Sequence, residues 1–597
     1  MRPTALADES LEHLRSLLRF NTSNPPGKEM AAARYLAQIL EREGFSPELI
    51  ESAPGRGNVV ARIKGRGNER PLLLLSHLDV VPAEAEHWSH DPFAAEIHEG
   101  YLYGRGAVDM KHMTAMSLMC ILGLKRSGKH LERDLIFAAV ADEESGGEYG
   151  AAYLVENHPA LLDAEFALCE VGGFRTEIKG RTYYPVQVAE RGAAWCRARF
   201  SGQSGHASVP DPDSAPHRMA RALVRLGKKG LPLHVTETVR HFVEQVAAQQ
   251  KTHVRLALKA LLNPVTHSKA LALLDPEQAR LFSAQLHNTA SPTQIRSGAL
   301  TNVIPSSAEV DLDGRVLPGQ TWESFRDELA KVLGEEVELE CLKWMEPLTY
   351  SYDTPLFDLI RRVIVEREPE AEVVPYLLTG LTDAKHLDKL GVVTYGFAPM
   401  NNEKTEQIAR LAHGHNERIG VEAFRWGQEV LYDVVERFCC APSSQKVVGG
   451  LMEDVLHPSQ LPPVKALGPE PEEAPGEEPE EAPEEAPEEA PEEAPEEAPE
   501  EAPEEAPEEA PEEAPKDATG FSKREMDRTM PAFPVEDRRP KAAPAPAPRS
   551  TSTLAPVDPP KPKHAPPKSS ESILGLDVLP HVGGVDKDGE DGDEGET

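Results

Sequence analysis

Three short apolar runs in the first third of the chain each end directly before acidic residues or histidine. The runs cover residues 72–75, 135–141 and 165–169. The residues that follow them are His77, Asp79, Asp142, Glu143, Glu144 and Glu170. Short apolar runs are typical of strands buried on both faces, as in sheets with parallel members. Ligands of such sheets collect at the carboxyl ends of the strands, so we expect these polar residues to meet at one edge.

Helical spacing of apolar residues separates the runs. Residues 9–19, 29–44, 114–124 and 150–157 have apolar side chains at i, i+3 and i+4, and a strand is expected over 58–63. The same character returns late in the chain, with helices expected over 356–366 and 421–438 and a strand over 392–397. This alternation predicts an α/β fold, a mixed sheet with helices on both faces.

The middle of the chain has a different pattern. Strand-like alternation over 184–200 and 302–316 encloses helical patterns at 215–226 and 237–287, and a further helix is expected over 322–333. We interpret this as a second, α+β domain inserted into the first. The predicted limits are 1–190 and 348–441 for the two parts of the α/β domain and 191–347 for the insert.

The C-terminal segment 442–597 is of low complexity, with about nine copies of Glu-Glu-Ala-Pro over 480–515. A proline at every fourth position prevents a helix and like charges repel, so we expect a disordered, extended tail. Residues from 441 onward hold 40 of the 100 acidic and 14 of the 63 basic residues, or −26 of the net charge of −37. The acidity is therefore mainly a property of the tail, and no basic face for nucleic acid is evident.

Cysteine usage and hydropathy bear on the compartment. The six cysteines are scattered without Cys-x-x-Cys spacing, which predicts reduced thiols in the cytoplasm. No apolar stretch approaches the roughly 18 residues that a membrane helix needs, and the N-terminus lacks the apolar core of a signal peptide. We expect no membrane partner.

The polar strand ends carry the types of side chain that bind metals. Imidazole together with carboxylates suits zinc, with cobalt or manganese as alternatives. His77 and Asp79 project to the same side of an extended strand, so Asp79 can orient the imidazole. Glu143 and Glu144 leave a strand end in different directions, so one can bind a metal while the other acts as general base.

These residues belong to a set of linked motifs. The set comprises His77-Leu78-Asp79, residues 104–111 (GRGAVDMK), Asp142-Glu143-Glu144, Glu170 before Gly172-Gly173, and His413-Gly414-His415-Asn416-Glu417. In order and spacing it resembles the dinuclear zinc amidohydrolases and exopeptidases of metallopeptidase family twenty. That family includes aminoacylases, carboxypeptidase S and succinyl-diaminopimelate desuccinylase, and the resemblance covers about residues 5–440.

The resemblance implies a role for each residue. Asp109 would bridge two zinc ions, with His77 and Glu170 completing one site and Glu144 and His413 the other. Glu143 would be the general base, and Asp79 would orient His77. The family's spacing favours His413 over His415 as the ligand.

The resemblance also implies that the insert is a lid that forms a homodimer. His206, in Ser-Gly-His-Ala-Ser, would stabilise the oxyanion. Asn302 and Arg315 would bind the substrate carboxylate or oxyanion, and Gly380 would line the pocket. An arginine fork suits a carboxylate because it can make two parallel hydrogen bonds.

The predicted function is the hydrolysis of an amide bond in a small N-acyl amino acid or short peptide by a metal-activated water. A serine hydrolase is disfavoured because the chain has no Gly-x-Ser-x-Gly motif. The alternative from another class is a catalytically inactive binding or scaffold protein that keeps the fold and engages partners through its acidic tail.

Overall fold

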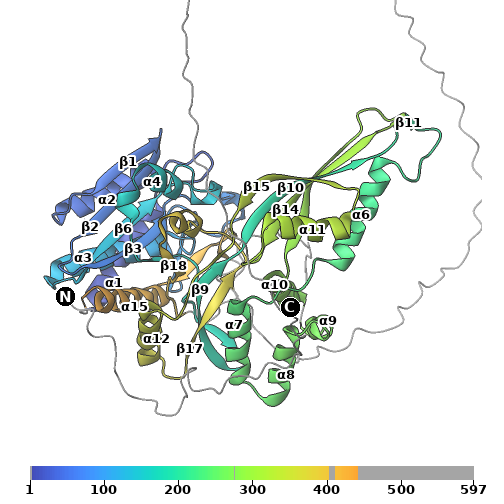
Figure 1. The fold of residues 1–597 in the computed structure, drawn as a ribbon. Helices are drawn as coiled ribbons and strands as arrows, with labels where there is room; N and C mark the ends of the chain where they lie inside the picture. The colour runs from blue at the N-terminus through green and yellow to red at the C-terminus, as the bar shows by residue number, and fades with distance from the viewer. Residues whose placement is uncertain (1–2, 275, 402–410, 441–597) are drawn as a thin grey trace, which may run out of the picture. The chain divides into compact units, whose positions relative to one another are not determined.

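The computed structural model describes residues 3–274, 276–401 and 411–440. The expected tail at 442–597 lies outside the described residues. A ten-stranded sheet forms the centre of the described part, in the order β1-β2-β6-β3-β7-β18-β9-β16, with β8 and β17 also paired to β9 (Figure 1). Its strands are β1 Glu48–Ala53, β2 Arg56–Ile63, β3 Glu69–His77, β6 Arg133–Val140, β7 Phe166–Cys169, β8 Thr176–Ile178, β9 Arg181–Glu190, β16 Leu348–Thr349, β17 Glu372–Leu378 and β18 Val393–Gly396.

The three apolar runs form neighbouring parallel strands. β3 pairs in parallel with both β6 and β7, and β7 pairs in parallel with β18. Alternate side chains of these strands enter two different cores, as the period of two in a strand requires. Leu72 and Leu74 join one core, while Leu73 and Leu75 join the other.

Helices cover both faces of this sheet, as the sequence predicts. The core around Leu72 is closed by helices α1 Pro3–Leu18, α2 Met30–Arg42, α3 Lys111–Ser127, α12 Pro355–Arg367 and α15 Val421–Cys440. The core around Leu73 is closed by the shorter helices α4 Ala151–Asn157, α5 Pro159–Leu162 and α13 Ala384–Leu387. No helix in the described part of the chain combines the length and apolar character that crossing a bilayer requires.

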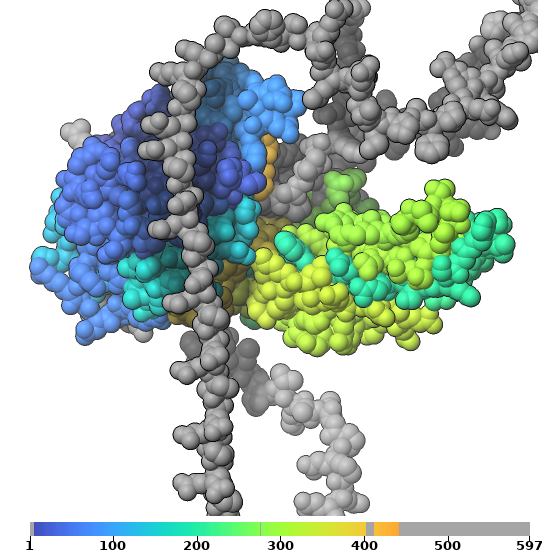
Figure 2. Space-filling view, turned by 90° about the horizontal axis from the view of Figure 1, so that it is seen from above, coloured from blue at the N-terminus to red at the C-terminus, as the bar shows by residue number. Residues whose placement is uncertain are grey.

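A second, four-stranded sheet has the order β12-β14-β10-β15. Its strands are β10 Gly192–Ser201, β12 Thr289–Ser297, β14 Ser307–Val316 and β15 Glu338–Met345. Helices α6 Ala215–Lys229 and α11 Trp322–Leu333 pack on one face of it. The opposite face carries cross-strand ion pairs, among them Arg197 with Asp311 and Arg199 with Glu309. In the space-filling view this part of the chain is green to yellow-green, beside the blue N-terminal part (Figure 2).

The middle of the chain differs from the expected pattern in two respects. The alternation over 184–200 is not one strand, because the chain passes from the large sheet to the small one at Arg191, between β9 and β10. The segment 237–287 forms four helices, α7 Glu237–Ala248, α8 Thr252–Leu261, α9 His267–Leu271 and α10 Pro276–Leu286. Their apolar faces share a core with β9 and β17, so they cover the large sheet although they lie between strands of the small one.

Two small sheets complete the described fold. β11 Gly205–His206 pairs with β13 Val303–Ile304, next to the small sheet. β4 Ile97–His98, β5 Tyr101–Tyr103 and β19 Arg418–Gly420 form a three-stranded sheet. Single 3-10 turns occur at Ala85–His87, Glu143–Ser145 and Asp388–Leu390.

Candidate metal centre

The carboxyl ends of β3, β6 and β7 meet at one edge of the large sheet. His77 is the last residue of β3, and Glu170 follows β7 directly. After β6 the chain turns at Asp142, whose φ is +71°, into the 3-10 turn that holds Glu143 and Glu144. Because β6 and β7 both run parallel to β3, their polar ends converge, as expected.

Two groups of potential metal ligands share Asp109. One contains His77, Asp109 and Glu170, the other Asp109, Glu144 and His413, and within each group one ligand atom per residue lies within 4.8 Å of the others. Nε2 of His77 is 3.2 Å from Oδ1 of Asp109 and 3.5 Å from Oε2 of Glu170. Nε2 of His413 is 3.2 Å from Oδ2 of Asp109 and 3.1 Å from Oε2 of Glu144. The two oxygens of Asp109 thus face different groups.

The ionisation of these residues reflects their crowding in a buried place. Burial favours neutral imidazole, but hydrogen bonds to the carboxylates outweigh it and raise the pKa of His413 to about 11. Burial alone would raise the pKa of Asp109, yet the hydrogen bonds from His413 and His77 lower it. Burial, with the charge of Asp109, raises the pKa of Glu144 to about 7.

The donor set fits divalent metal ions. Oε1 of Glu144 is a buried atom without a hydrogen-bond partner among the described residues. Three carboxylates and two imidazole nitrogens aimed at two points would be stabilised by divalent cations, and this N/O set is one that zinc accepts. His77, Asp109 and Glu170 would hold one ion, and Asp109, Glu144 and His413 the other.

Asp79 contacts the turn of Glu143 and Glu144 as well as His77, the one contact that the sequence predicted. Nδ1 of His77 is 3.0 Å from the backbone oxygen of Asp79 and 3.5 Å from its Oδ1. The Asp79 carboxylate also accepts hydrogen bonds from the backbone N–H groups of Glu143 and Glu144, both at 3.1 Å, and from Nδ2 of Asn24. One buried carboxylate therefore ties the end of β3 to the turn after β6.

Glu143 lies outside both ligand groups. Burial raises the pKa of this carboxyl, and its Oε1 is 3.8 Å from Nζ of Lys385. Lys385 is itself buried and donates to the backbone oxygen of Thr382. Sequence reasoning missed Lys385, which lies in the same Thr-Gly-Leu-Thr-Asp-Ala-Lys stretch as Gly380.

Glu417 is a second residue whose position sequence reasoning missed, although it stands in the last motif. Its fully buried carboxylate accepts hydrogen bonds from Nη1 of Arg105 at 2.7 Å and from the backbone N–H of Gly106 at 3.1 Å. The other oxygen accepts from the N–H groups of Val108 at 2.7 Å and Asp109 at 3.1 Å. Glu417 thereby fixes the loop that presents Asp109.

His413, not His415, lies in a ligand group. The ring of His415 stacks on His87 with centroids 5.0 Å apart, and its Nε2 is 3.6 Å from Glu84. Half of the His415 side chain is exposed. This separation agrees with the family spacing that selected His413.

The residues expected to bind substrate lie mostly in the insert. His206 is exposed on β11, and its Nδ1 is 2.7 Å from Oγ of Ser208. Asn302 is exposed just before β13, and its backbone oxygen accepts from the N–H of Ala207. These two residues are therefore near each other, and within the described part of the chain neither forms a hydrogen bond or ion pair with either ligand group.

Arg315 and Gly380 occupy different places. Arg315 lies on β14 and makes a two-bond fork to Asp313 at 2.9 and 3.1 Å, so its guanidinium already faces a carboxylate. Gly380 is half-buried and follows β17, two residues before Thr382. Thr382 donates to Glu190 through both its backbone N–H and its hydroxyl.

An α/β sheet that gathers imidazole and carboxylate side chains at its strand ends has the arrangement expected of a metal-dependent hydrolase. Within this class, the chain belongs to the peptidase family M20/M25/M40, whose family model matches residues 73–437. It is an enzyme of the metallopeptidase and amidohydrolase type, which favours amide-bond hydrolysis over the inactive scaffold alternative.

Individual relatives agree with this placement. The chain is 29% identical to aminoacylase-1 of Sus scrofa over 451 residues, covering 73% of this chain and 96% of that protein. It is 28% identical to the N-fatty-acyl-amino acid synthase/hydrolase PM20D1 of Xenopus tropicalis over 433 residues, covering 69% and 82%. The M20 metallo-carboxypeptidase Sso-CP2 of Sulfolobus solfataricus shares the fold with a TM-score of 0.53 at 20% identity, covering 72% and 98% of the two chains.

Proposed function

We propose that this chain hydrolyses the amide bond of a small N-acyl amino acid or a short peptide, with two zinc ions as its cofactor. Cobalt or manganese could replace zinc in the same donor set. The observation that carries the proposal is the position of Asp109, whose two carboxylate oxygens face separate groups of ligands. The aminoacylase-1 and N-fatty-acyl-amino acid relatives support this substrate class.

When bound, the ions would polarise the substrate carbonyl and lower the pKa of a water molecule. Glu143 would accept the proton from the attacking water and return it to the leaving amine nitrogen. Two features support this role: Glu143 lies beside Glu144 yet outside the ligand groups, and burial raises its pKa. Asp79 would hold the turn of Glu143 and Glu144, and Lys385 would keep the base charged until it takes the proton.

The insert at 191–347 would act as a lid over the α/β domain formed by 1–190 and 348–441. His206 and Asn302 would stabilise the oxyanion, Arg315 would bind the substrate carboxylate, and Gly380 would line the pocket. The fork between Arg315 and Asp313 supports the carboxylate role, because a substrate carboxylate could take the place of the Asp313 side chain.

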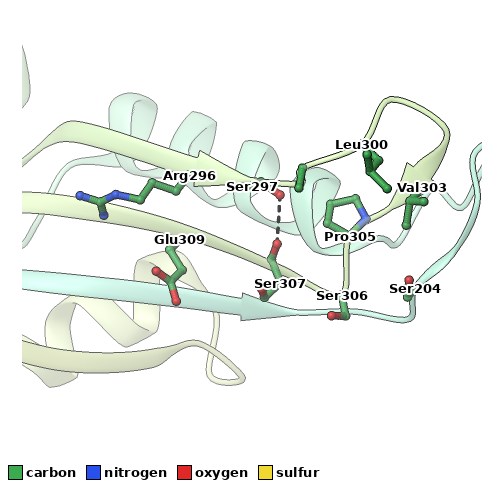
Figure 3. A pocket seen from close by; sticks show the side chains of 11 residues that line it. Ser204, Arg296, Ser297, Leu300, Val303, Pro305, Ser306, Ser307 and Glu309 are labelled. Carbon is green, nitrogen blue, oxygen red and sulfur yellow. Dashed lines mark hydrogen bonds between the residues drawn. The ribbon is translucent and has the colours of Figure 1, made fainter. Parts of the chain in front are cut away.

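We further propose a homodimer formed through the lid. β12 is an edge strand of the small sheet, and apolar side chains are exposed on it (Ile295 at 59%), on the loop that follows (Leu300 at 66%) and on β13 (Val303 at 40%). A hollow of about 560 Å³ lies here between Ser204, Arg296, Leu300 and Pro305 (Figure 3). An exposed edge strand beside exposed apolar side chains is a surface on which a second copy can add. Leu300→Glu should then shift the sedimentation of the chain from dimer to monomer.

Free thiols at all six cysteines agree with a reducing compartment, so we propose that the enzyme is cytoplasmic. The acidic tail would serve as a solvated spacer.

A release assay tests the function. The full chain, supplied with zinc or cobalt, is incubated with a panel of N-acyl amino acids and dipeptides, and the released amine is measured. Glu143→Gln should abolish turnover of every active substrate and leave two bound metal ions per chain. Glu148→Gln is the matched control, because Glu148 is an exposed residue of the same loop. Normal turnover by the Glu143→Gln variant would show that another group is the base.

A further inference from the structure

A third group of potential ligands lies outside the candidate metal centre. It consists of His90, Glu96 and His98, and one ligand atom from each residue lies within 4.8 Å of the other two. Nε2 of His98 is 2.8 Å from Oε2 of Glu96, and Nδ1 of His90 is 4.0 Å from the same oxygen. Together they offer two imidazole nitrogens and one carboxylate.

The rings of this group lie in contact with each other and with Tyr103. His90 and His98 stack with centroids 3.8 Å apart and planes 15° from parallel. Tyr103 packs against His90 at 4.4 Å, and Arg418 lies over the ring of Tyr103 at 5.5 Å. The lone pair of an imidazole nitrogen lies in the ring plane, so one of the two rings would turn out of the stack to share an ion with the other, and both rings would be neutral in that state.

The backbone that carries the group is constrained. β4, which ends at His98, pairs with β5, and β5 pairs with β19. Ala95, which precedes Glu96, is completely buried. On the other side, the backbone N–H and hydroxyl of Ser89 both donate to Oδ1 of Asn416 at 2.6 and 2.7 Å, which fixes the turn just before His90.

The chemistry of the donors selects the kind of ion. Two imidazoles and a carboxylate suit zinc, cobalt or nickel and are a poor set for magnesium or calcium, which prefer oxygen ligands. The side chains remain partly open, with exposures of 26% for His90, 53% for Glu96 and 42% for His98. Three protein ligands would leave a coordination position for water, and the ion would exchange with solvent more readily than an ion at the buried ligands around Asp109.

We propose that His90, Glu96 and His98 form a third metal site, which binds one divalent zinc-type ion independently of the two ions at the candidate centre. The ion would connect the loop at His90 to the β4–β5 hairpin, and thus stiffen the segment that Ser89 ties to Asn416, three residues beyond His413.

Equilibrium dialysis against cobalt, with the full chain first stripped by a chelator, tests the proposal. The wild-type chain should bind one more equivalent than His98→Ala, and Glu96→Gln should weaken this last equivalent by at least about tenfold, because it removes the charged ligand. The control is His130→Ala, an exposed histidine away from the group, which should match the wild type. The visible absorption of the last cobalt equivalent gives an independent readout of nitrogen ligation.

A measurement of catalysis distinguishes the third metal site from the hydrolase function proposed above. With two equivalents bound, His98→Ala should retain its kcat/KM within about twofold, a difference of about 0.4 kcal/mol. Equal stoichiometry in the wild type and His98→Ala, or a wild type that binds only two ions, would overturn the third site and leave the hydrolase proposal standing. A wild type that binds no ion at all would overturn both.

Discussion

The buried carboxylate of Glu417 allows a quantitative test of how the centre is supported. In Glu417→Gln one oxygen remains, which can keep the hydrogen bonds from Val108 and Asp109 at 2.7 and 3.1 Å. The new amide group would then face the guanidinium of Arg105 and the N–H of Gly106, which are donors themselves. The substitution therefore leaves two donors unpaired and one buried cation without its counter-ion.

The magnitude follows from these contacts. Hydrogen bonds to charged groups contribute about 1.5–3 kcal/mol each, and removing one partner of a buried ion pair costs about 3–5 kcal/mol. We expect the free energy of unfolding of Glu417→Gln to fall by about 3–5 kcal/mol. At about 2–4 °C per kcal/mol for a large domain, the melting temperature should drop by at least about 6 °C. Metal affinity should fall as well, because the loop that presents Asp109 loses its anchor.

The assay compares thermal unfolding and metal binding of chelator-stripped and metal-loaded protein. Glu422→Gln is the control, since that carboxylate is 85% exposed and lies five residues further on. A Glu417→Gln variant that melts within about 1 °C of the wild type and binds metal with unchanged affinity would refute the reasoning.

Three further predictions follow from the structure. Burial raises the pKa of Glu190 from 4.5 to about 8. Between these two pH values the folded chain therefore keeps a proton that the unfolded chain has lost. The free energy of unfolding should decrease as the pH rises from 4.5 to about 8. Glu190→Gln should remove this decrease, whose total is at most about 5 kcal/mol at about 1.4 kcal/mol per pKa unit. An unchanged pH dependence in urea unfolding would contradict this prediction. Arg315→Ala should raise KM about tenfold, or about 1.4 kcal/mol, for substrates with a free carboxylate but not for the matching carboxamides; equal KM values would remove its proposed role. Deleting 443–597 should leave the melting temperature and kcat/KM nearly unchanged, and a loss of active protein would argue against a spacer.

The sequence predicted the inner strands β2, β3, β6, β7 and β18 of the large sheet because they carry a strong apolar signal, but it missed β17 although that strand is buried. The runs that form β3, β6 and β7 consist of consecutive apolar residues, as in strands buried on both faces. Because these strands are parallel, the polar residues after them lie at the same edge of the sheet. β1, β12 and β15 were missed, because they have few buried side chains and contain polar residues throughout. Their positions depend on a neighbouring strand more than on their own composition.

The sequence predicted which side chains gather at the candidate centre. It did not predict the residues that hold those side chains in place. His77, Asp109, Glu144, Glu170 and His413 are of ligand type and stand next to strand ends or in motifs, and the structure gathers all five. Asn24, Lys385 and Glu417 act through contacts with residues distant in the chain, which no local pattern reveals. The same holds for the helices of 237–287, whose apolar faces could equally have covered the small sheet.

The contacts of Glu417 with residues distant in the chain also affect how the enzyme folds during its synthesis. Its contacts to Val108 and Asp109 connect residues 309 and 308 positions apart, so a nascent chain cannot complete the centre until Glu417 has emerged from the ribosome. Until then the carboxylate of Glu417 does not hold the loop that bears Asp109, and the second ligand group lacks His413. Binding of both ions is thereby deferred until the two parts of the α/β domain, on either side of the insert, have been synthesised and have come together.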